Sequence, residues 1–406
     1  MGAMLALAAG IGIFSATNSV FVRPICESLG LARGKFTLYR TIISLVSVLC
    51  MPLYTALIKK FGAKKVMIAG ALGIATAVAG YATASSLWQF YLLAVLEGLF
   101  TNGISFITVT IVINAWFIDQ RGTASGIAYA GSGLGGAICT PIVSSLIEKI
   151  GWRGTYLSLA AVGLAILLPV ILFVIKNSPK EKGLEPYQNK KEEMQQPSLE
   201  PEGVMLKQAT KSGTFWLLMA GFFSLSLCVG GPYTHTVAYF TDIGYHPTTA
   251  AAVMSLYMIF LTLGKILLGG IFDRFGSMVG TLFVGFGCIG GMAFALFGKL
   301  AFSPWLYAIF LGCAGAGCSV AITVLVHRYF GTKDFSSIFS VMSMASTLGT
   351  ALSVPFMGVV YDSSGSYAVA WIALLALAVL TAFCLVGANL LAREKSGALE
   401  AQKVEQ

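Results

Sequence analysis

The 406-residue chain is 57% hydrophobic and only 11% charged, with a mean hydropathy of +0.82. This balance excludes an ordinary soluble protein, because soluble domains carry about 25% charged residues. The net charge of +9 does not indicate a nucleic-acid-binding protein, since the sequence contains no motif of that class. We therefore predict a polytopic membrane protein.

Twelve apolar stretches are long enough to cross a bilayer as helices, since about 20 residues span the hydrocarbon core. They occupy residues 3–22, 37–58, 66–85, 88–113, 123–147, 155–175, 214–240, 247–271, 278–297, 304–326, 335–360 and 367–391. Between the sixth and the seventh lies the polar stretch 176–213, which has many charges, several prolines and no apolar periodicity. We read it as a solvated linker with at most one short surface helix.

These stretches predict an all-α membrane protein of two six-helix bundles. The N-terminal bundle is expected at 1–175, the cytoplasmic linker at 176–213, the C-terminal bundle at 214–391 and a cytoplasmic tail at 392–406. Lys and Arg accumulate in loops that stay in the cytoplasm. With both termini inside, the inner segments hold 18 of these residues and the outer loops hold six.

We therefore predict a multi-pass protein of the cell's inner (plasma) membrane with both termini cytoplasmic. A cleaved signal peptide is not expected, because no positively charged segment precedes the first apolar stretch.

The two halves also share an internal repeat with one constant offset in residue number, the offset that separates Gly62 from Gly276. The matching residues are mostly glycines, which lie within the predicted helices or directly after them: Gly62 and Gly276, Gly98 and Gly312, Gly103 and Gly317, Gly135 and Gly349, Pro141 and Pro355, Glu148 and Asp362, Gly151 and Gly365. One offset across three helix pairs predicts two parallel six-helix repeats related by an axis along the membrane normal. A site is then expected near the midplane between them.

A tight cytoplasmic turn after the eighth stretch carries Asp273 and Arg274. Such charges can brace neighbouring helix ends in one conformation and release them in another, although a merely solvated turn has the same composition. The first half keeps a basic residue at Lys60 but has Lys59 where Asp273 stands in the second. With Arg121 at the start of the fifth stretch, Asp273, Arg274 and Lys60 are the gating candidates.

The paired turns, the repeat and the central linker resemble the major facilitator superfamily. More narrowly, VFVRP at 20–24, WF at 116–117, RGTASG at 121–126, GWR at 151–153, NSP at 177–179 and KGL at 182–184 resemble the branch that contains oxalate:formate antiporters and monocarboxylate transporters. The resemblance implies the superfamily's fold and the activity of a secondary transporter.

In that branch a basic residue of the eighth helix is associated with the substrate carboxylate, and Lys265 stands at the matching position. On physical grounds, too, an ionisable group in a membrane helix marks a pathway, because burying it is costly. Lys265 lies eight residues before Asp273, about 12 Å along a helix. The alternative is a lysine that snorkels to the interface. The resemblance also implies a second basic residue in the eleventh helix of the oxalate transporters, whereas stretch 335–360 carries no charge, so we expect a monoanion rather than a dianion. Animal monocarboxylate transporters of the branch carry a lysine in the first helix, where this chain offers only Asn18.

Other polar residues in the apolar stretches are further candidates. Glu97 and His235 are proton-coupling candidates, with the alternatives of a structural partner for a hydroxyl or a lysine and of a hydrogen-bonded packing residue. Arg40 near the outer end of the second helix attracts anions or anchors to headgroups. The candidate substrate contacts are Lys265, Asn18, Asn102, Tyr129, Tyr233, Tyr257 and Arg40.

No enzymatic arrangement competes, since the sequence shows no phosphate loop, metal-ligand spacing or nucleophile elbow. We expect a secondary transporter without cofactor or metal that moves a small monocarboxylate-like anion by alternating access, as proton symport or anion exchange. Export of a larger amphipathic or drug-like solute is one alternative, and a transporter-like membrane sensor is an alternative of another class. The expected partners are the anion, protons and the lipid bilayer, without nucleic acid, and the chain is expected to be a monomer.

Overall fold

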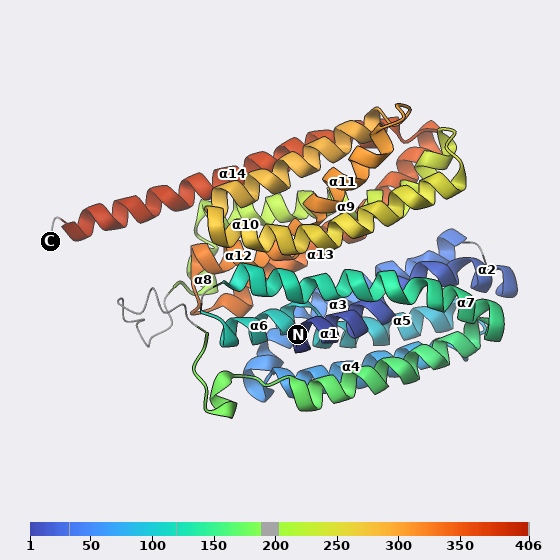
Figure 1. Cartoon of the computed structure of the whole chain (residues 1–406), viewed down its shortest axis with the longest axis horizontal. Helices are drawn as coiled ribbons and strands as arrows, with labels where there is room; N and C mark the ends of the chain where they lie inside the picture. The colour runs from blue at the N-terminus through green and yellow to red at the C-terminus, as the bar shows by residue number, and fades with distance from the viewer. Residues whose placement is uncertain (32, 119, 188–202, 405–406) are drawn as a thin grey trace. The chain divides into compact units, whose positions relative to one another are not determined.

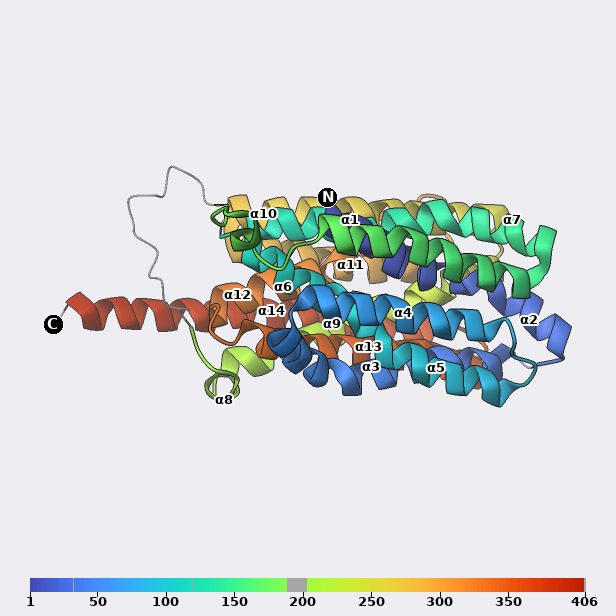
Figure 2. The same ribbon diagram turned by 90° about the horizontal axis from the view of Figure 1, so that it is seen from below.

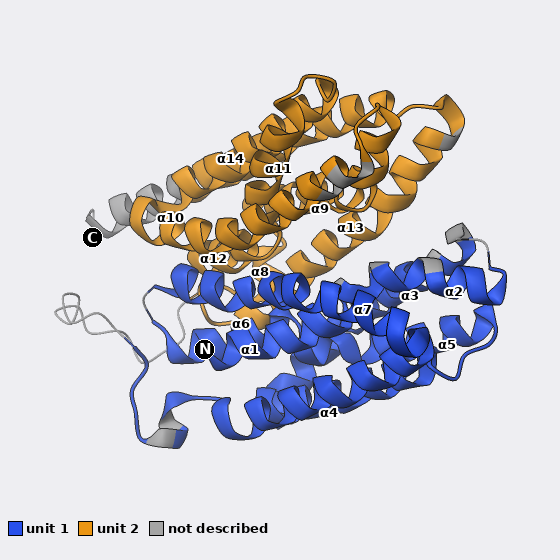
Figure 3. Cartoon of the chain, turned by 45° about the vertical axis from the view of Figure 1, so that its right-hand side comes forward, with its two compact units in different colours: residues 1–194 blue, residues 195–406 orange. Residues whose placement is uncertain are grey.

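The computed structural model describes residues 1–404 apart from 32, 119 and 188–202. The chain divides into two compact units, unit 1 at Met1–Met194 and unit 2 at Gln195–Gln406 (Figure 3). The described residues of both units form helices, and outside them only two isolated β-bridges occur. The predicted all-α fold is confirmed.

Figure 1 labels the helices of each unit. Unit 1 contains α1 (Gly2–Leu7), the π-helix η1 (Ala8–Ile13), the 3-10 helix η2 (Ala16–Phe21), α2 (Val22–Leu29), α3 (Arg33–Phe61), α4 (Ala63–Tyr81), α5 (Leu87–Thr101), η3 (Asn102–Ile104), α6 (Phe106–Trp116), α7 (Arg121–Pro169), η4 (Val170–Val174) and η5 (Pro179–Lys182). Unit 2 contains α8 (Leu206–Ala209), α9 (Gly213–Asp242), α10 (Pro247–Leu296), α11 (Ser303–Gly315), η6 (Ala316–Cys318), α12 (Val320–Phe330), α13 (Phe335–Ser364) and α14 (Ala368–Val404).

Two long helices each contain two spans. α7 leaves helical geometry at Gly151, where φ is 72°, and α10 does so at Gly276, where φ is 83°, a region that favours glycine. The described residues hold eight helices long and apolar enough to cross a membrane, or nine if the bent pair Ser303–Cys318 and Val320–Phe330 is one span. Dividing α7 and α10 at these glycines gives four spans. With the interrupted helix at the N-terminus included, the helices cover all twelve predicted stretches.

The repeat offset between Gly62 and Gly276 reappears in the contacts inside each unit. A Cβ atom on Gly98 would lie 2.8 Å from the Ile43 carbonyl oxygen, and one on Gly312 would lie 2.7 Å from that of Tyr257. Ile43 and Tyr257 are themselves separated by the repeat offset. Both crossings therefore need a glycine, because another side chain would overlap the facing backbone.

A second crossing repeats in the same way. A Cβ atom on Gly103 would lie 2.7 Å from the Cα atom of Gly70, and one on Gly317 would lie 2.8 Å from a methyl group of Val284, the repeat equivalent of Gly70. The helix breaks η3 and η6 also begin at equivalent positions, Asn102 and Ala316. The predicted repeat is thus confirmed within the units.

The polar stretch 176–213 is more structured at its ends than a solvated linker. In unit 1 the Tyr187 amide donates to the Trp116 carbonyl at 2.8 Å, and the Ile118 amide donates to the Tyr187 carbonyl at 3.0 Å. In unit 2 the Val204 amide donates to the Phe330 carbonyl at 3.0 Å. These pairings and the two short helices η5 and α8 correct the expectation of at most one short helix; residues 188–202 lie outside the described part. Backbone hydrogen bonds to loop residues left no periodic signal in the sequence.

The last helix, α14, runs on to Val404, beyond residue 391 where the apolar stretch was expected to end. Figure 2 shows this extension projecting past the other helices of unit 2. Most residues after 391 are polar or charged, so hydropathy gave no sign that the helix continues.

Candidate functional site

The strongest site candidate of unit 2, Lys265, lies on α10 and is only 6% exposed. The preceding residue, Gly264, brings α10 against α11, since a Cβ atom there would lie 2.9 Å from the Cα atom of Cys313. This close approach holds Lys265 beside η6, within electrostatic range of the Cys318 sulfur. Such burial favours a role inside the helix bundle over a side chain that reaches the interface.

Small polar side chains from two further helices lie next to Cys318. The hydroxyl groups of Ser226 on α9 and Ser346 on α13 are 2.5 Å apart, and Ser226 also contacts the Cys318 sulfur at 3.5 Å. Hydroxyl groups can turn their hydrogens toward an anion. Together with the ammonium of Lys265 they can hold a carboxylate. No pattern in the sequence pointed to these partners, because serine and cysteine are common in apolar helices.

In unit 1, Arg40 of α3 reaches the interrupted first helix. One guanidinium nitrogen, Nη2, contacts the Ser15 hydroxyl oxygen at 3.5 Å. Asn18, on η2, is 7% exposed. Among the described residues, neither Nη1 of Arg40 nor Nδ2 of Asn18 has a hydrogen-bond partner although both atoms are buried. These two buried nitrogen atoms are therefore hydrogen-bond donors without an acceptor in the described part of the chain.

Glu97, on α5, is 4% exposed and lies among aromatic rings. The Tyr81 hydroxyl donates a hydrogen bond of 2.8 Å to its Oε2 atom, and Arg40 is within electrostatic range. The Tyr81 ring packs against the rings of Tyr39, Phe90 and Tyr156, which in turn contact those of Phe21, Phe36 and Trp152. The structure therefore brings Glu97, Arg40 and a tyrosine together, an arrangement that no sequence spacing indicated.

His235 links three segments of unit 2. Its Nε2 atom is 3.2 Å from the Val354 carbonyl oxygen on α13, and its Nδ1 atom is 3.2 Å from the Tyr367 hydroxyl oxygen. Because a carbonyl oxygen only accepts, Nε2 carries a hydrogen. Both ring nitrogens are therefore engaged, which favours the packing interpretation of this residue.

The remaining substrate-contact candidates are buried aromatic and amide side chains. Asn102 is 1% exposed and donates from Nδ2 to the Ser47 carbonyl at 2.6 Å, while the Tyr129 hydroxyl pairs with that of Thr110. These bonds lie within unit 1 and favour helix packing. In unit 2 the rings of Tyr233 and Tyr257 lie 5.9 Å apart between centroids.

The gating candidates lie at helix-end turns. In unit 2 Arg274 is exposed and Asp273 is half-buried, and the turn that contains them is held by Arg328. This arginine donates to the Phe272 carbonyl at 2.5 Å and to the Ser277 hydroxyl at 3.0 Å. In the sequence Arg328 follows the predicted stretch 304–326 as one of the basic residues of the inner segments, and nothing there indicates these hydrogen bonds.

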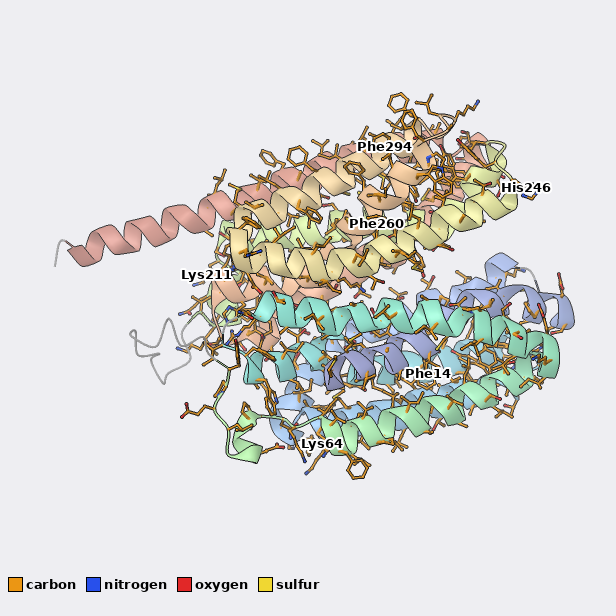
Figure 4. All side chains as sticks on the ribbon, viewed as in Figure 1. Phe14, Lys64, Lys211, His246, Phe260 and Phe294 are labelled. Carbon is orange, nitrogen blue, oxygen red and sulfur yellow. The ribbon has the colours of Figure 1, made fainter. Side chains whose placement is uncertain are left out.

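In unit 1, Lys60 lies over the Phe61 ring, with its ammonium 5.3 Å from the centroid. Arg121 donates to the Phe117 carbonyl at 2.6 Å, across the turn before α7. The equivalent of the Arg328 brace comes from Lys64 (Figure 4), whose amide donates to the Asn177 side chain at 2.9 Å and whose ammonium donates to the Leu172 carbonyl at 2.6 Å. Each unit thus ties down the turn after its second span, with different residues.

Comparisons with known proteins agree with this architecture. Residues 3–326 match the family model of the Major Facilitator Superfamily. Monocarboxylate transporter 13 of Bos taurus is 24% identical over 349 residues, covering 84% of this chain and 75% of that protein. Monocarboxylate transporter 12 of Rattus norvegicus is 25% identical over 358 residues, covering 82% and 73%. The crystal structure of the superfamily transporter FucP in the outward conformation aligns with a TM-score of 0.67 at 13% identity, covering 96% of this chain and 97% of that one.

Proposed function

Because the chain belongs to the Major Facilitator Superfamily, we propose that it is a secondary active transporter of a small monocarboxylate-like anion. It works by alternating access in the plasma membrane, with both termini cytoplasmic, and couples transport to protons by symport or to a second anion by exchange. The names of the relatives, which are monocarboxylate transporters, support the substrate class.

Lys265 is the observation that carries this proposal. An ionisable side chain buried in a membrane helix is costly and therefore marks a substrate pathway. The hydroxyl pair of Ser226 and Ser346, next to Cys318, adds neutral hydrogen-bond donors. One lysine with neutral donors suits a monoanion, so in our proposal the carboxylate of the substrate binds beside this ammonium.

Glu97 is our candidate for proton coupling, because it is a buried carboxyl group bonded to one tyrosine. His235 is the second candidate, held by a carbonyl and a hydroxyl. The turn of Asp273 and Arg274, braced by Arg328, is the proposed cytoplasmic gate.

The test is uptake of labelled formate, acetate, lactate and oxalate into proteoliposomes. Wild type is compared with Lys265→Ala and with Lys299→Ala, which removes an exposed lysine of an outer loop. Uptake is measured with an imposed inward proton gradient and, separately, with unlabelled anion inside. We expect saturable uptake of the monoanions that falls about tenfold or more in Lys265→Ala and is unchanged in Lys299→Ala.

The outcomes separate the alternatives. Dependence on the proton gradient assigns symport, and dependence on internal anion assigns exchange. Binding of a carboxylate without uptake under either condition identifies a sensor. If folded protein neither binds nor moves any of the four carboxylates, the anion proposal is wrong and amphipathic solutes are tested next.

A further inference from the structure

A group of hydrogen-bond donors in unit 1 contains two buried atoms that lack an acceptor among the described residues. Nη1 of Arg40 and Nδ2 of Asn18 are both buried, and within the described chain neither has a hydrogen-bond partner. Both atoms are donors, and a buried donor without an acceptor is costly, more so on a charged group. The fold therefore buries two hydrogen-bond donors whose hydrogen bonds a bound anion can accept.

The interrupted first helix places these donors on one side. Ser15 precedes the 3-10 helix η2, which contains Asn18. Residues three apart eclipse one another in a 3-10 helix, so Asn18 shares a face with Ser15. Since the Arg40 guanidinium contacts the Ser15 hydroxyl at 3.5 Å, it lies on the face of the first helix that also carries the Asn18 amide.

We infer that Arg40, Asn18 and Ser15 form an anion subsite in unit 1 that takes the carboxylate of a small monoanion. A guanidinium presents paired N–H groups that match the two oxygens of a carboxylate. The amide of Asn18 and the hydroxyl of Ser15 add neutral donors around it. The inference rests on the proposed anion transport, to which it adds a second binding position.

In its ionised form, Glu97 is the negative charge with which the incoming anion competes for Arg40. It lies within electrostatic range of Arg40, and its Oε2 atom already accepts the hydrogen bond from Tyr81. The aromatic surroundings strengthen the interaction, because charges act over longer distances in a medium of low polarity. Removing the charge of Glu97 should therefore tighten anion binding at Arg40, whereas removing a donor should weaken it.

The experiment measures formate binding to the purified full-length protein in detergent. The readout is the rise of the unfolding midpoint with formate concentration, and formamide serves as the uncharged analogue. All variants carry Lys265→Ala, so that binding at Lys265 does not contribute. In this background we expect formate, but not formamide, to stabilise the protein.

Variants that remove a donor should raise the apparent Kd for formate, and the variant that removes the charge of Glu97 should lower it. Arg40→Lys and Asn18→Ala should each weaken formate binding about tenfold. Glu97→Gln, whose amide oxygen still accepts from Tyr81, should strengthen it roughly threefold or more. Ser15→Ala, a milder change on the contact to Arg40, should weaken binding and serves if Arg40→Lys does not fold.

Three results would overturn the inference. The first is the absence of formate stabilisation in the Lys265→Ala protein. The second is an unchanged affinity in Asn18→Ala together with an unchanged affinity in Arg40→Lys, or in Ser15→Ala where Arg40→Lys does not fold, and the third is weaker binding in Glu97→Gln. The last would identify Arg40 and Glu97 as a structural charge pair.

Uptake into proteoliposomes distinguishes this failure from that of the proposed function. For uptake, Asn18→Ala and Ser15→Ala are made with Lys265 intact, and wild-type KM values in both would reject the subsite while transport stands. Formate binding that follows the expected pattern without any uptake by the unmodified chain would reject transport while the subsite stands.

Discussion

The Gly231 amide of α9 donates a hydrogen bond of 2.6 Å to the hydroxyl of Ser353 on α13. That hydroxyl in turn donates to the Leu227 carbonyl, so it stands between two groups that bond directly in a regular helix. Pro232 follows and supplies no backbone donor. In the internal repeat Pro232 is the equivalent of Asn18 in η2, so the proline of α9 stands where the first helix of unit 1 is interrupted.

Ser353→Ala should remove this hydroxyl bridge and leave the Gly231 amide and the Leu227 carbonyl to bond each other directly. We expect a loss of about 1 kcal/mol in the free energy of unfolding, because only part of the bonding is recovered. If α9 bends beside Pro232 during the alternating access that we propose, the maximal uptake rate should fall further than stability implies. Ser363→Ala removes an exposed serine of the same helix and is the control. Wild-type uptake in Ser353→Ala, measured beside the unfolding midpoint, would show that the bridging hydroxyl has no role in transport.

Gly312→Ala should destabilise unit 2, because the added methyl group would lie 2.7 Å from the Tyr257 carbonyl oxygen. Overpacking of this kind costs about 1–3 kcal/mol. Gly270 of the adjoining helix α10 is the matched control, since a Cβ atom there has nothing within 4 Å among the described residues. We expect Gly270→Ala to leave the unfolding midpoint unchanged within error and Gly312→Ala to lower it clearly. Equal midpoints would mean that the crossing yields without cost.

These glycines also explain why the architecture was predictable from the sequence. A helix crossing at backbone distance tolerates only the smallest side chain, so Gly98 and Gly312, and likewise Gly103 and Gly317, leave a visible spacing. The hydrogen bond between Tyr81 and Glu97 corresponds to no recognisable spacing in the sequence, because it depends on how two helices are rotated about their axes. Hydropathy identifies a span but does not fix that rotation.

The candidate sites divide in the same way. Lys265, Arg40 and Glu97 stood out because charge is rare in apolar helices. Ser226, Ser346 and Cys318 did not, since small polar residues are ordinary there and only the fold brings them together. Arg328 was visible as a basic residue of a loop, but its two hydrogen bonds to the turn after the eighth span were not.

Arg328→Ala should loosen the turn between the two spans of α10. The side chain is exposed, so we expect a change of at most about 1 kcal/mol in the free energy of unfolding. The local effect should be larger, because the Phe272 carbonyl and the Ser277 hydroxyl both lose their partner. Hydrogen exchange at amides 272–278 should become faster, with no change at the same positions in Arg274→Ala, which removes a neighbouring exposed arginine. Unchanged exchange in Arg328→Ala would contradict the brace.

Tyr81→Phe should expose the dependence of Glu97 on its hydroxyl partner. The Oε2 atom of a carboxylate only 4% exposed would lose its donor, which costs about 1–3 kcal/mol for a buried polar group. In a Glu97→Gln background the same substitution should cost less, because a neutral amide needs less compensation than a charge. A double-mutant cycle on the unfolding free energy should therefore give a coupling of about 1 kcal/mol between the two positions.

Tyr91→Phe is the control for this cycle, since its hydroxyl, on the same helix as Glu97, bonds to the Lys35 carbonyl at an exposed position. Its effect should be small and additive with Glu97→Gln. If Tyr81→Phe is also additive with Glu97→Gln, then the hydrogen bond contributes nothing specific to the carboxylate. The same variants can be tested for transport. If Glu97 couples protons, as we propose, Tyr81→Phe should reduce uptake driven by a proton gradient more than it reduces exchange of internal for external anion, because exchange requires no net proton movement.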